Sequence, residues 1–329
     1  MQNNFTPSSA LGFLMRATSI LISACLLAAA LVSPASATHF RYGSITWTQA
    51  GGNAVNVTLQ MASRRTFYTP FGCLNISSGT PAPTACTGPG GDPGIGDIVN
   101  PFETFIWGDS SSTSVFLKVT SIDPANDWLF GVALDPASFP AEVTTLPHTY
   151  AGPPADFLAF FERCCRINIT ATGAVHQNNL DRGFSVETLI NVGGTNNSPV
   201  TAVAPIVLCR INSFCDFSVP AADPDGDTVS FRLSTSAEAK GLPLGGQPDA
   251  FVQPGPPDAP NAASIDMNTG LYTWDTTGAN GVIGDFYSTQ VTIEDGDSKI
   301  AVDFLIQLSA ADPNPPTIVG DPAAVCGPA

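Results

Sequence analysis

Charged side chains are scarce in this sequence: Asp, Glu, Lys and Arg make up only 12% of its 329 residues, and acids outnumber bases 28 to 12. The formal net charge of -16 repels phosphate backbones and anionic lipid, which argues against nucleic acids and acidic membranes as partners and favours cations. After residue 37, no apolar run reaches the roughly 18 residues of a spanning helix. We therefore expect no membrane span.

The motifs of several common enzyme classes are also missing. The sequence has no G-x-S-x-G elbow, no H-E-x-x-H, no phosphate-binding glycine loop and no dinucleotide fingerprint. We therefore expect that the chain is not an enzyme. A glycosidase stays open as an alternative, because its two carboxylates need no fixed spacing in sequence.

The N-terminus carries an export signal. Arg16 precedes an apolar run from Ile20 to Val32, and Ala35-Ser36-Ala37 follows as a cleavage site, which is the pattern of a secretory signal peptide. A lipoprotein anchored at Cys25 is the competing interpretation. We expect a protein that is secreted or held at the cell surface.

The composition predicts an all-β fold. Glycine (30) and proline (29) are abundant, as in short strands joined by many turns, and the exported part is longer than one sandwich of roughly 100 residues. Ser198 and Pro199 end a run of small, turn-forming residues that marks a boundary. The predicted organisation is a signal peptide (1–37), an N-terminal β-sandwich (38–195), a second β-sandwich (196–310) and a linker or tail (311–329).

Alternation of apolar and polar residues predicts individual strands, most clearly from Ala54 to Met61. Further strand-like runs are expected at 42–48, 114–121, 128–134, 157–161, 184–192, 202–208, 215–219, 228–233, 271–274, 288–293 and 300–308. The stretch from Tyr68 to Pro101 is too long for a hairpin turn, so we expect a surface insertion.

The cysteines of an exported chain are expected to form disulfides. Proximity in sequence predicts the pairs Cys73–Cys86 and Cys209–Cys215, and Cys326 is the candidate for an unpaired thiol. The adjacent residues Cys164 and Cys165 allow two interpretations. We favour two structural bridges running in opposite directions over a bond between the neighbours.

One turn has the composition of a cation site. Asp223, Asp225 and Asp227 alternate with a proline and a glycine, and carboxylate oxygens are the ligands that calcium prefers. The glycine and glutamate positions of an EF-hand loop are not matched. Asp/Gly clusters are also ordinary turn formers, so on spacing alone both interpretations stay open.

Three segments resemble cadherin-like and immunoglobulin-like repeats of surface proteins. They are Asn196-Asn197-Ser198-Pro199 with the turn at 217–227, the segment from Ser264 to Trp274, and the strand from Val291 to Gly296. The resemblance covers about residues 196–308 and implies calcium bound between successive domains by Asn197, Asp223 and Asp225, with Asp227 as a further candidate. The linker lacks the aspartates of the cadherin pattern, which implies fewer ligands.

The strings Thr38-His39-Phe40-Arg41-Tyr42-Gly43-Ser44-Ile45-Thr46-Trp47 and Phe160-Phe161-Glu162-Arg163-Cys164-Cys165-Arg166-Ile167 resemble a poorly characterised module found ahead of such repeats. It implies no activity. For His39, a hydrogen-bonded structural role is favoured over a catalytic one.

These observations predict a secreted or surface adhesion-type protein, stiffened by calcium between its domains, whose partner is an extracellular protein or polysaccharide. The alternative is a carbohydrate-binding module or a glycoside-active enzyme, in which tryptophans stack on sugar rings. The candidates for such stacking are Trp47, Trp107, Trp128 and Trp274. Core packing is the competing role for these side chains.

Overall fold

The computed structural model describes residues 39–170, 172–241 and 250–311. The predicted signal peptide, Cys326 and all of the predicted tail except Ala311 lie outside these residues. Within them the chain forms sheets whose strand pairs are antiparallel with one exception, the parallel pair β14–β21. The all-β prediction is confirmed.

The first segment of the chain supplies twelve strands of the largest sheet. In chain order they are β1 (Phe40–Gly51), β2 (Ala54–Arg64), β3 (Cys73–Asn75), β4 (Ala82–Thr84), β5 (Ile98–Val99), β6 (Thr104–Ile106), β7 (Ser112–Ser114), β8 (Phe116–Asp123), β9 (Trp128–Leu134), β10 (Leu146–Thr149), β11 (Asp156–Arg163) and β12 (Phe184–Asn191). The 3-10 turns are η1 (Arg65–Phe67), η2 (Pro89–Gly91) and η3 (Pro136–Ser138).

Strand β2 shows why these residues form a half-buried sheet. Val55, Val57, Leu59 and Met61 are buried, whereas the residues between them are partly exposed. This alternation matches the two-residue period of a strand, in which successive side chains point to opposite faces. The strand predicted from Ala54 to Met61 is thus confirmed.

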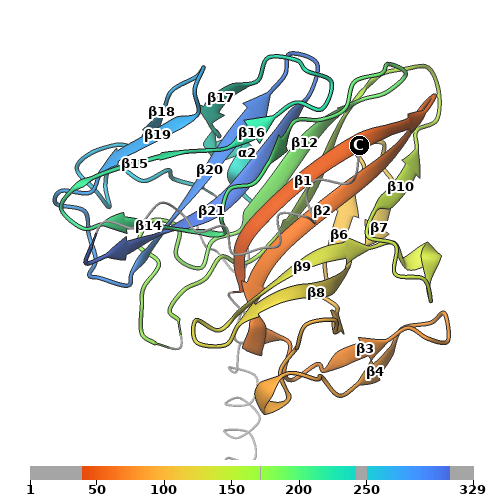
Figure 1. Cartoon of the computed structure of the whole chain (residues 1–329), viewed down its shortest axis with the longest axis horizontal. Helices are drawn as coiled ribbons and strands as arrows, with labels where there is room; N and C mark the ends of the chain where they lie inside the picture. Colours follow the sequence, from red (N-terminus) through yellow and green to blue (C-terminus); the bar gives the residue numbers. More distant parts are fainter. Residues whose placement is uncertain (1–38, 171, 242–249, 312–329) are drawn as a thin grey trace, which may run out of the picture. The chain divides into compact units, whose positions relative to one another are not determined.

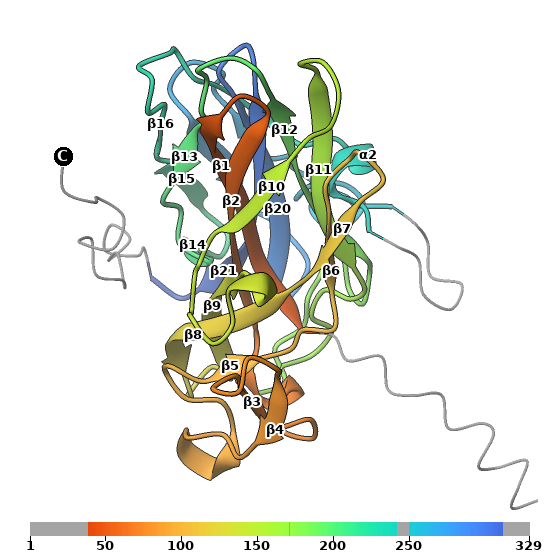
Figure 2. The ribbon, with the colours of Figure 1, turned by 90° about the vertical axis from the view of Figure 1, so that its right-hand side faces the viewer.

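The predicted insertion between Tyr68 and Pro101 contains short strands of its own. β3 pairs with β4 and β5, and β5 pairs with β8, which extends the sheet at one end (Figure 2). The bridge Cys73–Cys86, between residues 13 apart in sequence, joins β3 to the chain after β4. This segment is therefore tied to the sheet by both backbone pairing and a disulfide.

The second segment supplies the remaining strands. They are β13 (Val200–Thr201), β14 (Ile206–Arg210), β15 (Phe214–Ser218), β16 (Ala221–Ala222), β17 (Ser230–Leu233), β18 (Ser264–Ile265), β19 (Leu271–Asp275), β20 (Phe286–Glu294) and β21 (Lys299–Ser309), with the short helix α2 (Ser236–Ala239) after β17. β15, β19 and β18 form a separate sheet, and β13 pairs with β16. The bridge Cys209–Cys215 joins β14 to β15, so both disulfides predicted from proximity are present.

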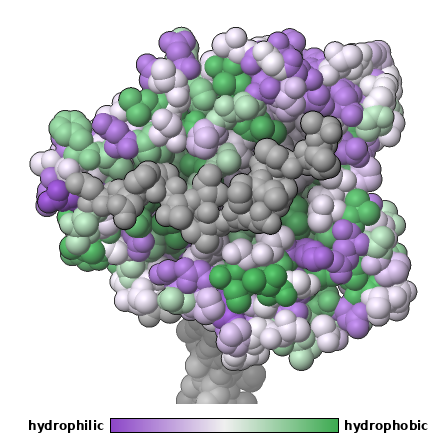
Figure 3. Space-filling view, in the orientation of Figure 1, coloured by the Kyte–Doolittle hydropathy of each residue, from purple (hydrophilic) through white to green (hydrophobic). Residues whose placement is uncertain are grey.

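The core of the second segment lies between two sheets. Cys215, Tyr272 and Trp274 from the three-stranded sheet belong to the same buried cluster as Tyr287 of β20 and Phe304 of β21. Burying apolar surface between two sheet faces is the main stabilising contribution in a sandwich. On the face drawn in Figure 3, apolar residues lie in separate patches among polar ones.

β21 joins the two segments within one sheet. It pairs with β1 through Ser44 and Val302, and with β12 through Thr188 and Ile300. In Figure 1 the blue strands β20 and β21 lie beside the orange β1 and the green β12. The segments 38–195 and 196–310 thus share a sheet, and their folding as separate domains stays a prediction.

Candidate functional site

The linker between the two segments is pinned against β1. The Trp47 backbone N–H donates to Ser198 Oγ at 2.8 Å, and the Ser198 N–H donates to the Trp47 carbonyl at 3.0 Å. The Gln49 N–H donates to Asn197 Oδ1 at 2.9 Å. These bonds satisfy backbone groups at the end of β1 that would otherwise need water or another strand.

The same linker contacts the acidic turn that follows β16. Asp225 accepts hydrogen bonds from the Asn197 backbone N–H (2.6 Å to Oδ2) and from the Asn197 side-chain amide (2.8 Å to Oδ1). Asp223 Oδ1 accepts from the backbone N–H groups of Asp225 (2.8 Å) and Asp227 (3.3 Å). The structure therefore brings Asn197 and Asp225 together, while Asp223 stabilises the turn itself.

This turn fits a cation only in part. Asp223 Oδ2 is buried and has no hydrogen-bond partner among the described residues, which is the kind of oxygen that a hard cation takes as a ligand. Both oxygens of Asp225, in contrast, already accept from Asn197. Within the described ranges, His, Cys or acidic ligand atoms gather in threes within 4.8 Å only beside two cysteine pairs. The turn offers carboxylates without a preassembled cluster.

A second acidic turn, between β20 and β21, holds the other linker asparagine. The Asn196 side-chain amide donates to Asp295 Oδ2 at 3.2 Å. Asp295 also accepts from the Ser298 backbone N–H at 2.5 Å and from Ser298 Oγ at 2.7 Å. Sequence analysis missed this contact, although the run Asp295-Gly296-Asp297 has the same turn composition as the first site. We call the contacts of Asn196, Asn197 and Ser198 the linker clamp.

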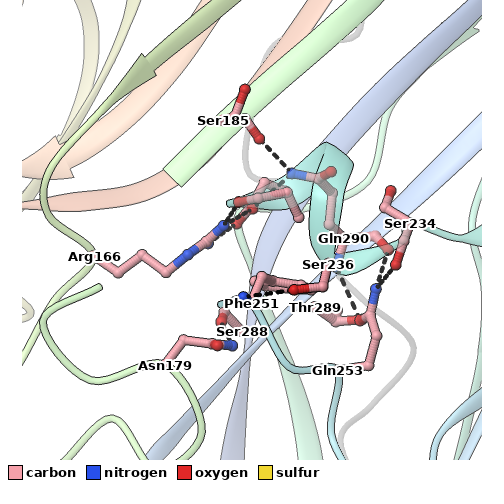
Figure 4. A network of polar contacts seen from close by, with 12 residues as sticks. Arg166, Asn179, Ser185, Ser234, Ser236, Phe251, Gln253, Ser288, Thr289 and Gln290 are labelled. Atoms are coloured by element: carbon pink, nitrogen blue, oxygen red, sulfur yellow. Dashed lines mark hydrogen bonds and ion pairs between the residues drawn. The ribbon is translucent and has the colours of Figure 1, made fainter. Parts of the chain in front are cut away.

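A buried ion pair also joins the two segments (Figure 4). Arg166, from the chain after β11, donates to both carboxylate oxygens of Asp303 on β21, at 2.6 Å each. The two side chains are 1% and 0% exposed. Gln290 donates to the same carboxylate at 3.0 Å and to the Ser185 carbonyl at 2.7 Å. Asp303 therefore accepts hydrogen bonds from Arg166, in the chain after β11, and from Gln290 on β20. A buried carboxylate needs such partners to offset the loss of water.

A chain of ion pairs runs beside this network. Lys299 on β21 donates to Glu187 on β12 (2.5 Å) and to Glu238 on α2 (2.9 Å). Arg232 on β17 donates to Glu238 and to Glu294 on β20. Burial raises the pKa of Glu187, and Lys299 opposes this change. These contacts connect strands of both segments, which indicates a structural role.

The two strings quoted above, at the start of β1 and after β11, meet in space. The backbone N–H groups of His39 (3.0 Å) and Phe40 (3.2 Å) both donate to the Cys165 carbonyl, and the Ile167 N–H donates to the Phe40 carbonyl at 3.3 Å. Cys164 and Cys165 are bonded to each other. The prediction of two bridges in opposite directions was therefore wrong, because the thiols of these neighbours lie close enough to pair with each other.

His39 lies in the interior, against Phe67 and Glu103. It is 3% exposed, its ring stacks on Phe67 with 3.9 Å between centroids, and its Nε2 lies 3.9 Å from Glu103 Oε1. Arg163 approaches the other oxygen of Glu103 at 3.6 Å. Burial raises the pKa of Glu103 to about 8, and Arg163 opposes this shift. Sequence analysis identified His39 but missed Glu103.

The tryptophans are placed in the core. Trp47, Trp107 and Trp274 are at most 1% exposed, and Trp128 packs against the buried cluster of the second segment. Side chains so enclosed have no free face for a sugar ring. Core packing is therefore the role of the first three.

The fold and the linker clamp define an all-β protein in which one linker connects two sheet-forming segments. Among the residues that the structure describes, no helix is long and apolar enough to cross a membrane.

Comparison with known proteins shows that this chain is similar to integrin beta-like proteins. The family model of the integrin beta-like protein A-E N-terminal region matches residues 41–193. Integrin beta-like protein A of Dictyostelium discoideum is 27% identical over 282 residues, which is 82% of this chain and 12% of the relative. Protein E of the same organism is 35% identical over 138 residues, 40% of this chain and 6% of the relative. Protein C is 26% identical over 88% of this chain and 12% of its own length.

This chain thus spans about an eighth or less of these relatives. The matched residues 41–193 lie within the segment predicted as the N-terminal sandwich. Among solved structures, the two tandem V-type regions of VCBP3, a v-region-containing chitin binding protein, match with a TM-score of 0.30 and 12% identity. That match covers 63% of this chain and 86% of the other.

Proposed function

We propose that this chain is a secreted or cell-surface binding protein of the adhesion type. Support comes from the integrin beta-like proteins that it resembles along most of its length, together with the predicted export signal. The observation that carries the proposal is the linker clamp, in which Asn197 bonds both to β1 and to the Asp225 turn. A fixed junction between two sheet-forming segments is what a protein that transmits force between surfaces needs.

Calcium reinforces this junction in our proposal, as it does in the cadherin-like repeats that the second segment resembles. Asp223 would supply the oxygen that lacks a hydrogen-bond partner, and Asp225 and Asp227 would add negative charge beside it. Since Asn197 donates to both oxygens of Asp225, calcium binding would require this contact to rearrange. Such a site would have a modest affinity, because few carboxylates converge on it.

The test is calorimetric titration of calcium into residues 38–329, compared with the double variant D223A/D225A. Heat in the parent and none in the variant would support the proposed site. A rise in Tm with millimolar calcium should accompany it, since a ligand of the folded state stabilises that state. D266A is the matched control, because Asp266 also accepts backbone hydrogen bonds in an exposed turn. Equal heats in all three proteins, or none in the parent, would reject calcium at this turn.

The variant N197A, measured in the absence of calcium, tests the linker clamp itself. In N197A, Asp225 loses both the side-chain donor at 2.8 Å and the constraint that holds the linker near it. The variant should melt at a lower temperature than the parent in the presence of a chelator. An unchanged Tm would show that the linker contributes nothing to the junction.

A further inference from the structure

Two exposed phenylalanines form a surface cluster at the edge of the insertion. Phe71 is 51% exposed and Phe102 is 42% exposed, and their rings meet edge to face with 4.7 Å between centroids. Phe67, 9% exposed, contacts both rings from below. Aromatic side chains grouped at a surface are typical of the centre of binding sites.

The backbone holds Phe102 in an unfavourable conformation. Its φ of 62° lies in the left-handed region, which a bulky residue rarely adopts. Two contacts keep it there: the Phe102 N–H donates to Asn100 Oδ1 at 2.7 Å, and Arg163 Nη1 donates to the Phe102 carbonyl at 2.9 Å. A strained backbone that keeps an apolar ring in solvent is characteristic of functional sites.

Arg163 gives the cluster a charge. Its side chain is 48% exposed, while the nearby Glu103 is 1% exposed at its side chain. An arginine side chain stays positively charged in proteins, and about half of the Arg163 surface is open to a ligand. In a chain with a net charge of -16, an exposed guanidinium bonded to the backbone of Phe102 is distinctive.

We propose that Phe71, Phe102 and Arg163 form a docking site for a partner polypeptide that presents an apolar side chain next to a carboxylate. The apolar side chain packs on the two rings and the carboxylate pairs with the guanidinium. A sugar fits less well, because its hydroxyl groups need hydrogen-bond partners, and both backbone polar groups of Phe102 are already bonded. This inference rests on the proposed function as a binding protein and specifies the surface that it uses.

The experiment measures weak binding of three blocked dipeptides to residues 38–329 by NMR titration without calcium. The probes are acetyl-Phe-Glu-amide, acetyl-Phe-Gln-amide and acetyl-Phe-Lys-amide. We expect the Glu peptide to bind about two- to fivefold more tightly than the Lys peptide, the range for a partly exposed ion pair. The double variant F71A/F102A should lose at least tenfold in affinity for all three, and R163Q should lose the preference among them.

F214A is the matched control, since Phe214 is 70% exposed on β15, away from the cluster in sequence and on another sheet. Its affinities should equal those of the parent. Melting temperatures show whether each variant is folded. If F71A/F102A is not folded, the single variant F71A takes its place in the titration. Equal binding by the parent and F71A, a preference for the Lys peptide, or binding of cellohexaose in place of the peptides would overturn the proposal. The peptide titration contains no calcium, so the docking site and the calcium site are tested independently. Either proposal can be rejected while the other stands.

Discussion

Removing Arg166 should strongly destabilise the protein, because its loss leaves Asp303 buried without its charge partner. The two side chains are 1% and 0% exposed and are joined by two hydrogen bonds of 2.6 Å. Breaking a buried pair of this kind costs about 3–5 kcal/mol. R166M should therefore lower the free energy of unfolding by that amount at pH 7, measured by urea denaturation.

The pH dependence of R166M separates a charge effect from lost packing. Burial raises the pKa of Asp303, whereas Arg166 lowers it, so the variant should bind a proton more tightly at this carboxyl than the parent does. A pKa above the unfolded value of about 3.9 favours the folded state at low pH, and this contribution is lost as pH rises. The difference in the free energy of unfolding between R166M and the parent should therefore shrink as the pH is lowered from 7 to 4.5.

Two further variants make this prediction refutable. R166M/D303L replaces both charges by apolar groups and should lose less stability than R166M alone. K118M removes an exposed partner of Glu142, with side chains 34% and 39% exposed, and should cost less than about 1 kcal/mol. A cost for R166M no larger than that of K118M, or one that does not change with pH, would refute the reasoning.

Two other predictions concern the first segment. Burial raises the pKa of Glu103 from 4.5 to about 8, so this residue's contribution to stability is greatest below pH 4.5 and is lost as pH rises towards 8. In E103Q, the Tm measured from pH 5 to 9 should therefore fall less steeply than in the parent. Parallel curves of Tm against pH would contradict this prediction. C73S/C86S opens a bridge between residues 13 apart and should lower the free energy of unfolding by about 3 kcal/mol in a urea titration. When parent and variant are both treated with a reductant, which also opens the other bridges, the two proteins should unfold at the same urea concentration, and a remaining difference would refute the prediction.

Local pattern was sufficient for individual strands and for two of the three bridges, but not for the bond between the neighbours Cys164 and Cys165. The alternation from Ala54 to Met61 predicted β2, because burial of every second side chain is a property of the strand itself. Cys73–Cys86 and Cys209–Cys215 followed from proximity, since short loops place thiols close together. The acidic turn and the linker asparagine were identified as a joint, and the structure brings Asn197 to Asp225.

The contacts that join the segments were decided by the tertiary structure alone. No local pattern reports that β21 pairs with β1 and β12, because a strand's partner depends on the path of the whole chain. Arg166 and Asp303 lie 137 residues apart in sequence, so neither looks like half of an ion pair until the fold removes both from water. The same holds for Phe71 and Phe102, since sequence records that a residue is apolar, and only packing decides which apolar residues stay exposed.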